Sequence, residues 1–256
     1  MADMPVYVIN LATSSQRRES ISRQAEEMAL RVEFVTAVDG SKPHPLFTHV
    51  DPALRQSRKG RPFRAGEMGC WASHYQLWQR CVERGAPIIV LEDDVTLKPG
   101  LPDLLKALPL LPDGIEYFRL HAASRPGRTA LRFGQFQLYQ YWRSPMCAFG
   151  YYLTPAAAQR FLRHARQWVL AVDDYMDQAW LHGVECLGLA QGVVSNQDEF
   201  ASVICAQPRP RVKLGLRGWA SRESYRAWLR LRSELHNLPL RWQLDAPKAD
   251  MAVETR

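Results

Sequence analysis

Residues 87–95, with the sequence PIIVLEDDV, join an apolar run to three consecutive carboxylates. An uncharged run with two isoleucines and a valine is typical of a buried parallel strand that is covered on both faces. Glu92, Asp93 and Asp94 then follow the carboxyl end of that strand, where open α/β sheets bind their ligands. Because adjacent negative charges repel one another, a hard divalent cation with oxygen ligands is their natural partner. The alternative interpretation is an acidic loop that caps the next helix.

The start of the chain predicts a strand followed by a helix. Residues 6–11 are rich in β-branched side chains, and residues 13–16 fit a capping box at a helix start. The turn between them presents Asn10, Arg17 and Arg18, where a nucleotide can rest, although two arginines on a helix are also commonly just solvated. With a second predicted strand after this helix, the order indicates alternating βαβ units.

The region before the acidic strand predicts a loop and then a helix. Residues 41–64 are rich in Pro, Ser, Arg and Lys without periodicity, which predicts an exposed loop. The helix begins near Gly66 and has one core-facing stripe, formed by Trp71, Tyr75, Trp78 and Val82. His74 lies beside this stripe, where it serves either as a hydrogen-bonded structural residue or as a ligand or base.

Several of these segments form an ordered set of motifs. They are Ile9-Asn10-Leu11 followed by Arg17-Arg18, then Ala37-Val38-Asp39-Gly40, Gly66-Glu67-Met68-Gly69-Cys70 with Ser73-His74 and Trp78, and Leu91-Glu92-Asp93-Asp94-Val95. In this order and spacing, over roughly residues 5–200, the chain resembles glycosyltransferase family 25, the lipopolysaccharide and lipooligosaccharide glycosyltransferases related to the collagen galactosyltransferases. The resemblance implies an α/β, GT-A-like nucleotide-sugar fold with a central mostly parallel sheet. It also implies an inverting transfer from a UDP-sugar, commonly UDP-galactose, with Mn²⁺ or Mg²⁺.

The resemblance assigns roles to the matched positions. It places a DxD-type motif at the acidic triplet, with Glu92 in place of the first Asp. Asp94 is then the expected metal ligand and Glu92 the second candidate, and the metal neutralises the charge that grows on the UDP leaving group. The implied donor-binding residues are Asn10, Leu11, Arg17, Arg18, Asp39, Glu67, Ser73, His74, Glu92 and Asp93.

A second acidic cluster, Asp173-Asp174 with Asp177, follows Val172. On a helix Asp173 and Asp177 share a face, where like charges are destabilising unless a ligand uses them. The alternative interpretation of this cluster is purely structural, because the dipole of a helix favours acidic side chains at its N-terminus. The family has an acidic position after a valine here, and an inverting displacement needs a carboxylate to take the proton from the acceptor hydroxyl. We therefore expect Asp173, and next Asp174, to be the base or an acceptor anchor, with His74 and Asp177 as further candidates.

Length and composition set the broad class. The chain has 256 residues, 46% of them hydrophobic, which is ample for a core. Its five cysteines have neither CxxC spacing nor an even count, so neither a zinc site nor a disulfide framework is indicated, and we expect reduced, buried thiols. The first residues show neither a basic region nor a long apolar segment, so we expect a cytoplasmic protein.

The net charge of +7 is concentrated at the C-terminus, where residues 208–256 hold eleven Lys or Arg against five acids. We therefore divide the chain into a catalytic domain at 1–207 and a basic tail at 208–256. A predicted tail helix capped by Ser221 has one mostly apolar side (Tyr225, Trp228, Leu229, Leu235) and one basic stripe (Arg222, Arg226, Arg230).

Two interpretations of this tail helix remain open. Such a helix suits an anionic membrane surface, which would make the protein peripheral on the inner membrane, close to a lipid-linked oligosaccharide acceptor. It equally suits a helix that packs on the domain with its arginines in water.

Two other function classes also remain open. The acidic triplet suits a metal-dependent phosphohydrolase, and the basic tail suits a nucleic-acid-binding module. Because the sequence contains no recognisable motif for reading nucleic acid, we expect no nucleic-acid partner.

Overall fold

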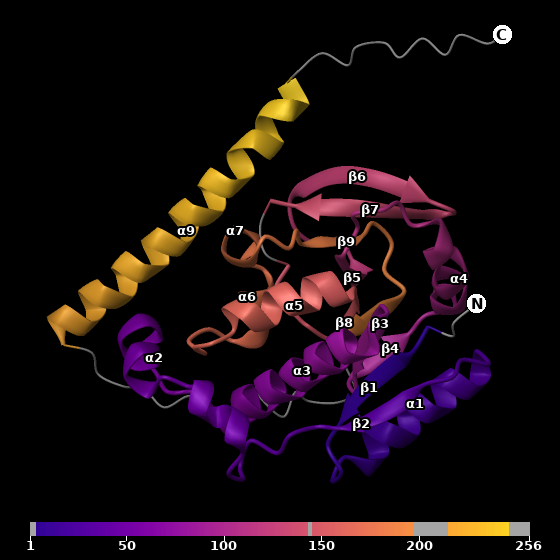
Figure 1. The fold of residues 1–256 in the computed structure, drawn as a ribbon, viewed down its shortest axis with the longest axis horizontal. Coiled ribbons are helices and arrows are strands. Elements are labelled where there is room, and N and C mark those ends of the chain that lie inside the picture. The colour runs from indigo at the N-terminus through magenta and orange to yellow at the C-terminus, as the bar shows by residue number, and fades with distance from the viewer. Residues whose placement is uncertain (1–3, 143–144, 197–214, 246–256) are drawn as a thin grey trace.

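The computed structural model describes residues 4–142, 145–196 and 215–245, which form a mixed α/β domain and a long C-terminal helix (Figure 1). The strands are β1 (Val6–Asn10), β2 (Glu33–Thr36), β3 (Ile88–Glu92), β4 (Val95–Leu97), β5 (Tyr117–Ala122), β6 (Gly127–Phe133), β7 (Phe136–Tyr141), β8 (Gly150–Leu153), β9 (Leu187–Leu189) and β10 (Val194–Asn196). The α-helices are α1 (Ser15–Glu27), α2 (Pro52–Lys59), α3 (Ala65–Arg84), α4 (Gly100–Ala107), α5 (Pro155–His164), α6 (Val172–Met176), α7 (Ala179–His182) and α9 (Leu216–Asp245). Two short 3-10 helices are η1 (Pro45–His49) and η2 (Leu108–Leu110).

The sheet is mixed rather than mostly parallel. Its strand order is β2-β1-β3-β8-β5-β9-β7-β6, with β10 joining β5 and β4 to one side. Strand β1 is parallel to both β2 and β3, whereas β8 lies antiparallel between β3 and β5. Because Leu91 of β3 pairs with Gly150 of β8, β8 begins at the edge where β3 ends. The loop before β8 therefore reaches the carboxyl ends of β1, β2 and β3.

Helices cover both faces of the sheet, and each face has its own apolar core. On one face α3, α5 and α6 pack against the sheet, and Trp71, Trp78 and Phe161 are fully or almost fully buried there. On the other face α1 and α4 contribute Ile21 and Leu101 to the second core. The predicted acidic strand is β3, whose residues 88–91 are buried as a doubly covered strand requires.

The prediction of an exposed loop at residues 41–64 is wrong. This segment contains η1 and α2, and Asp51 caps α2 by accepting a hydrogen bond from the backbone N–H of Leu54 (2.8 Å). Arg55 is completely buried, and its guanidinium donates to the carbonyl of Val169 (2.6 Å) and to the carboxylate of Glu67 (3.2 Å). Composition alone indicated a loop because these partners come from distant parts of the chain.

Three smaller expectations also differ from the structure. Ser14 is the N-cap residue of α1, but its side chain makes no capping hydrogen bond. Cys147 is exposed and Cys70 half-buried, so the cysteines are not uniformly buried. Cys205 lies outside the described residues. The tail helix begins at Leu216, so Ser221 lies inside it and not at its cap.

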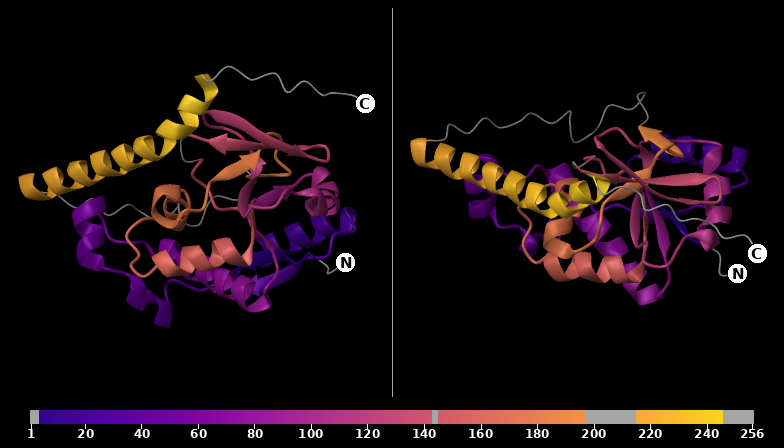
Figure 2. Two further views of the ribbon diagram at one scale, coloured as in Figure 1. Left: turned by 45° about the horizontal axis from the view of Figure 1, so that its top comes forward. Right: turned by 90° about the horizontal axis from the view of Figure 1, so that it is seen from above.

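Helix α9 lies along one side of the domain, where it contacts α2 and α7 (Figure 2). The predicted domain boundary between residues 207 and 208 lies outside the described residues and stays a prediction. Within the described part of the chain, no helix is both long enough and apolar enough to cross a membrane.

Two glycines set the close approach of α3 to the loop after β2. A Cβ on Gly69 would overlap the carbonyl oxygen of Val38, and a Cβ on Gly40 would overlap that of Ala65. We therefore expect Gly69→Ala to push α3 away from this loop and to lower the free energy of unfolding by about 1–3 kcal/mol, as overpacking does. Urea unfolding measures this change.

Gly215→Ala is the matched control, because its added Cβ meets no atom of the described residues within 4 Å. It should change the free energy of unfolding by less than about 0.5 kcal/mol. Equal effects of the two substitutions would contradict the proposed steric contact.

Candidate active site

A cavity of about 310 Å³ lies at the carboxyl ends of β1, β2 and β3, a volume suited to a small-molecule ligand. The predicted residues that line it are Leu11, Arg17, Asp39, Ser73, His74, Glu92, Asp93 and Asp94. Three predicted donor residues, Asn10, Arg18 and Glu67, are not part of the lining. The sheet thus brings together side chains from four separate segments of the chain.

The three carboxylates at the end of β3 have unequal partners. Asp93 accepts hydrogen bonds from the amide of Asn10 (2.7 Å) and from the guanidinium of Arg17 (2.9 Å). Asp94 shares Arg17 at a longer distance of 3.4 Å. Burial, together with the charge of Glu92, raises the pKa of Asp94 to about 6. The charge of Asp93 is therefore well compensated, whereas Asp94 is only weakly paired.

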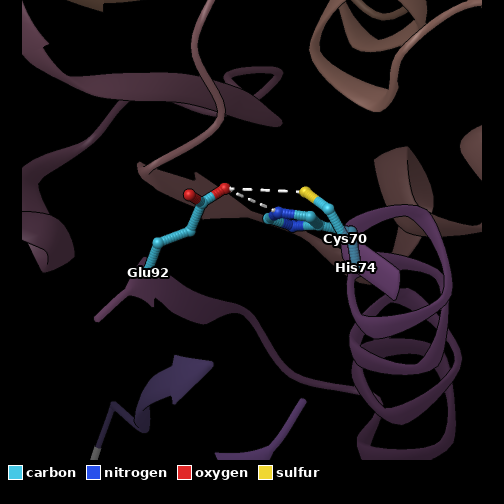
Figure 3. Close-up of side chains that lie close together, drawn as sticks. All are labelled: Cys70, His74 and Glu92. Atoms are coloured by element: carbon cyan, nitrogen blue, oxygen red, sulfur yellow. Dashed lines mark hydrogen bonds and ion pairs between the residues drawn. The ribbon is translucent and has the colours of Figure 1, made fainter. Parts of the chain in front are cut away.

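Two side chains of α3 point toward Glu92 (Figure 3). Nε2 of His74 lies 3.1 Å from Oε1 of Glu92, and the thiol of Cys70 lies 3.9 Å from the same oxygen. These residues are one helical turn apart, so both face the end of β3. The candidate ligand atoms of the three residues all lie within 4.8 Å of one another.

A buried chain of hydrogen bonds determines the tautomer of His74. The indole N–H of Trp78 donates to the hydroxyl of Tyr151 (3.1 Å), which lies 2.9 Å from Nδ1 of His74. An indole nitrogen can only donate, so the Tyr151 hydroxyl accepts from Trp78. A carboxylate can only accept, so Nε2 carries the proton, and Nδ1 of the neutral ring accepts from the Tyr151 hydroxyl. Burial raises the pKa of Tyr151, which keeps the phenol protonated. The proton of His74 is then on Nε2 and is donated to Glu92.

Glu92 is therefore a carboxylate oriented by two donors. Burial and the charges of Glu92 and Asp173 raise the pKa of the Cys70 thiol well above its usual range, so the thiol keeps its proton. The carboxylate oxygens of Glu92 and Asp94 match the ligands that Mg²⁺ and Mn²⁺ prefer.

The second acidic cluster reaches the same edge through the loop before β8. The backbone N–H of Glu92 donates to the carbonyl of Phe149 (2.9 Å), which ties this loop to the end of β3. The N–H of Cys147 donates to Asp173 and that of Met146 donates to Asp177, both at 3.1 Å.

The loop that carries these donors is strained. Met146 and Cys147 have φ values of +52° and +91°, which non-glycine residues rarely adopt. Such conformations persist where surrounding contacts hold them, and they concentrate at functional sites.

The three aspartates of this cluster have different environments. Asp177 forms an ion pair with the fully buried Arg119 (2.8 Å), and its own side chain is 1% exposed. Asp174 pairs with Lys59 of α2 (3.2 Å) near the surface. Asp173 has no such cation partner among the described residues, and burial together with the charge of Asp174 raises its pKa to about 6.

Asp173 is linked to the end of β3 through the loop before β8, because this loop contacts Asp173 at Cys147 and Glu92 at Phe149. The charges of Glu92, Asp173 and Asp94 all raise the pKa of the Cys70 thiol. Asp173 does not line the 310 Å³ cavity itself. The arrangement joins a carboxylate with a raised pKa to the edge of the sheet that carries the acidic cavity.

Several predicted donor residues have structural contacts. Arg18 stacks on the ring of Phe34, with its guanidinium carbon 4.2 Å from the ring centre. Glu67 accepts hydrogen bonds from Arg61 (2.8 Å) and Arg55 (3.2 Å). Both contacts lie outside the cavity.

Ser73 and Asp39 line the cavity and also make local hydrogen bonds. The hydroxyl of Ser73 donates to the carbonyl of Gly69 (2.7 Å) and accepts from the N–H of Val38 (2.9 Å). Asp39 accepts hydrogen bonds from the backbone and side chain of Ser41, which lower the pKa of Asp39. These contacts shape the wall of the cavity.

The sequence interpretation did not assign roles to Cys70, Cys147, Arg119 or Lys59. For Arg119 a signal was available, because it is a charged residue in an otherwise apolar strand-like run, YFRL at 117–120. A buried strand position requires a partner for such a charge. No local pattern indicated that Cys147 donates its backbone N–H to a side chain 26 residues later.

Comparison with known proteins identifies the family of this chain. A model of glycosyltransferase family 25 (LPS biosynthesis protein) matches residues 3–176. The chain belongs to glycosyltransferase family 25. The match includes the acidic triplet at the end of β3 and the cluster at 173–174, so both parts of the candidate site lie within the family region.

Curated relatives of this family 25 member include enzymes and proteins named as inactive. Procollagen galactosyltransferase 1 from Danio rerio is 30% identical over 188 residues, which cover 67% of this chain and 30% of that protein. Procollagen galactosyltransferase 2 from Homo sapiens is 34% identical over 96 residues, 35% of this chain and 15% of that protein. Inactive glycosyltransferase 25 family member 3 from Homo sapiens is 36% identical over 109 residues, 40% of this chain and 18% of that protein.

The chain therefore spans less than a third of the length of these relatives. Among solved structures, a glycosyltransferase involved in the glycosylation of the major capsid of PBCV-1 covers 61% of this chain and 62% of its own. Its sequence identity is 9% and its TM-score 0.30, a likeness too slight to carry an argument.

The hydrogen-bond chain to Glu92 makes Tyr151 a critical residue of this family 25 member. Tyr151→Phe leaves the indole N–H of Trp78 and Nδ1 of His74 without their partner in a fully buried place. We expect it to lower the free energy of unfolding by about 1–3 kcal/mol, the cost of unsatisfied buried polar groups. Chemical denaturation gives this value.

Tyr152→Phe is the matched control. Tyr152 lies on the opposite face of β8, and its hydroxyl makes no hydrogen bond to the described part of the chain. This substitution should be within about 0.5 kcal/mol of the parent. A Tyr151→Phe protein as stable as Tyr152→Phe would overturn the assigned hydrogen-bond chain.

Proposed function

We propose that this family 25 member is an inverting galactosyltransferase with a GT-A-like fold. It moves galactose from UDP-galactose to the core saccharide of a lipopolysaccharide or lipooligosaccharide, with the help of Mn²⁺ or Mg²⁺. The observation that carries the proposal is the pairing of an acidic cavity at the ends of β1–β3 with a nearby carboxyl, Asp173, whose pKa is about 6. The galactose donor is supported by the names of the procollagen galactosyltransferase relatives.

The cavity suits a nucleoside diphosphate. Apolar side chains from two strand ends, such as Ile9, Leu11 and Val38, line one part of it and offer a surface for a base. Arg17 lies at the acidic part, beside Asp93 and Asp94. A guanidinium there can bind phosphate oxygens, because its planar donors match their geometry. Asn10 and Arg17 hold Asp93 in place, where its carboxylate can accept hydrogen bonds from a ribose or sugar.

Asp94 and Glu92 are the residues that would hold the metal ion. Both offer carboxylate oxygens, Asp94 is weakly paired, and Glu92 is oriented by His74. When bound there, the ion supplies positive charge to the diphosphate leaving group. Asp93 and Asp94 share one arginine within ion-pair distance, so a cation would also relieve the mutual repulsion of the three carboxylates.

We assign the role of general base to Asp173. Its carboxylate accepts the N–H of Cys147, and it forms no ion pair with a cation among the described residues. The acceptor hydroxyl would donate to this carboxylate, which would take its proton as the new glycosidic bond forms. A pKa near 6 makes Asp173 a stronger base than an exposed aspartate while keeping it ionised at neutral pH. Attack on the face opposite the departing UDP inverts the anomeric carbon and gives a β-linked product.

Asp94→Asn tests the metal assignment. The substitution keeps the shape of the side chain but removes its charge, so transfer from UDP-galactose should fall by at least about a hundredfold. Added Mn²⁺ should not restore it. Release of UDP with a truncated lipooligosaccharide as acceptor is the measurement, and undiminished activity in EDTA would exclude a metal role.

The same assay separates the transferase from a phosphohydrolase. A transferase should release UDP only slowly when the acceptor is absent, whereas a phosphohydrolase would consume UDP-galactose equally fast with and without acceptor.

Asp173→Asn tests the base. Because the base acts on the acceptor only as the bond forms, kcat should fall by about 10²–10⁴-fold while UDP-galactose affinity stays within a few-fold of the parent. In the parent, kcat/KM should decrease as the pH falls through about 6, because Asp173 becomes protonated there. In saturating Mn²⁺, which keeps the metal ligand Asp94 ionised, this acidic limb should be missing from the residual activity of the variant. Titration calorimetry in Mn²⁺ and a pH–rate profile give the two readouts.

Asp174→Asn is the control for this experiment. Asp174 pairs with Lys59 near the surface and should have a milder effect on kcat. Loss of donor binding in Asp173→Asn would make Asp173 a donor residue, and near-normal turnover would remove it from the mechanism.

A further inference from the structure

Helix α9 presents two different faces along its length. Its inward face contacts α2 and α7 through the partly buried Tyr225, which stacks under Arg58 of α2, and through Trp228, which packs edge-on against Trp180 of α7. Asn237 donates to the carbonyl of Trp142 (2.8 Å), and His236 pairs with Glu185 (3.0 Å). These contacts hold α9 on the domain, so its orientation relative to the body is set.

The opposite face of α9 is apolar and exposed. Leu216, Leu231, Leu235 and Leu238 are between 44% and 81% exposed. At 3.6 residues per turn these leucines fall within an arc of about 100°. Ala220 and Ala227 lie in the same arc, which extends the apolar stripe over most of the described helix. We call the four leucines with these two alanines the outer stripe.

Basic residues flank the outer stripe on both sides. Arg226 and Arg230 lie along one edge, and Arg217 and Arg232 lie toward the other. Between residues 216 and 239 the helix has five arginines and two glutamates. One of these acids, Glu223, is already bridged by Arg222 and Arg226. Trp219, which is 52% exposed, lies beside Arg226 and Arg230 at the edge of the stripe.

The geometry points to an anionic lipid surface as the occupant of the outer stripe. A helix that lies in a membrane interface buries an apolar face among the acyl chains, while arginines at its edges reach anionic headgroups and tryptophans sit at headgroup level. The outer stripe, its flanking arginines and Trp219 supply these three features. A helix that lies in the interface in this way attaches the protein peripherally.

Two other occupants of the outer stripe, a second copy of the chain and nucleic acid, fit it less well. A second copy of the chain would pair the outer stripe with itself, and a two-fold interface would place the arginine edges of both helices close together. Nucleic acid would satisfy the arginines but would leave four exposed leucines without an apolar partner.

Attachment through α9 would also orient the candidate site. Helix α2 lies against α9, and its Lys59 pairs with Asp174 of the second acidic cluster. Helix α7 contacts α9 and follows directly after that cluster along the chain. The second acidic cluster, where we propose that the acceptor binds, is therefore next to α9. This position suits an acceptor that is carried on a lipid.

Vesicle sedimentation of the full-length protein tests the inference. At low salt the protein should bind vesicles of phosphatidylcholine with about one third phosphatidylglycerol and should bind pure phosphatidylcholine at least about tenfold more weakly. Raising the salt concentration should weaken binding, because it screens the arginines. Vesicle binding requires no transfer reaction, so its result is independent of the proposed function.

Paired variants separate the outer stripe from the flanking charge. Leu231→Glu with Leu235→Glu should reduce binding to anionic vesicles by at least about tenfold, because two apolar side chains are lost from the interface. Arg226→Gln with Arg230→Gln should reduce binding and its dependence on salt. Leu110→Glu is the control, because Leu110 is 63% exposed on η2, outside α9. The control should bind like the parent.

Three outcomes would overturn the inference. One is a Leu231→Glu, Leu235→Glu protein that binds vesicles as the parent does while its circular dichroism shows an unchanged fold. Another is equal binding of the parent to neutral and anionic vesicles. The third is a lipid-free parent that elutes as a dimer while the leucine variant elutes as a monomer, which would assign the outer stripe to self-association.

Discussion

Three carboxylates at the end of one buried strand impose the main constraint on this protein. Burial strengthens the repulsion between neighbouring carboxylates, so each of the three acids needs its own hydrogen-bond or ion-pair partner. Asp93 is satisfied from the β1–α1 turn by Asn10 and Arg17, and Glu92 is satisfied from α3 by His74. Asp94 receives the weakest protein partner and shows the clearest rise in pKa. The parallel pairing of β1 with β3 is what makes this division possible, because both strands end at one edge.

The antiparallel strand β8 adds the second half of the candidate site. Its start lies beside the end of β3, so the preceding loop must turn sharply at the same edge. Two consecutive residues of that loop have positive φ, and their N–H groups donate to Asp173 and Asp177. The buried Arg119 stabilises this loop by donating to the carbonyl of Cys147 and to Asp177. Backbone strain, a buried ion pair and a carboxyl with a raised pKa thus occur together, as they commonly do at functional sites.

Family membership and the geometry of the site support different statements about this protein. Membership rests on a family match over residues 3–176, whereas the relatives are far longer than this chain and include proteins named as inactive. The proposal of an active enzyme therefore rests on this chain's own carboxylates. The same holds for α9, which lies beyond the matched region and carries the features from which membrane attachment is inferred.

The sequence by itself determined the elements whose signals are local. The apolar run before Glu92 predicted β3, and the spacing of Trp71 and Trp78 predicted the buried face of α3. The motif order indicated the family, and it singled out most of the residues that line the cavity. These predictions succeeded because strand burial and helix periodicity depend on near neighbours in the chain.

Only the tertiary structure decided which groups share an environment. It ordered residues 41–64 through the buried Arg55, and it assigned Tyr151 to the hydrogen-bond chain behind His74. It also turned the leucines of α9 outward and separated Asp173 from the ion-paired Asp177. Each of these outcomes depends on partners tens of residues away, and pKa values, tautomers and exposure follow from such distant contacts and not from local sequence patterns.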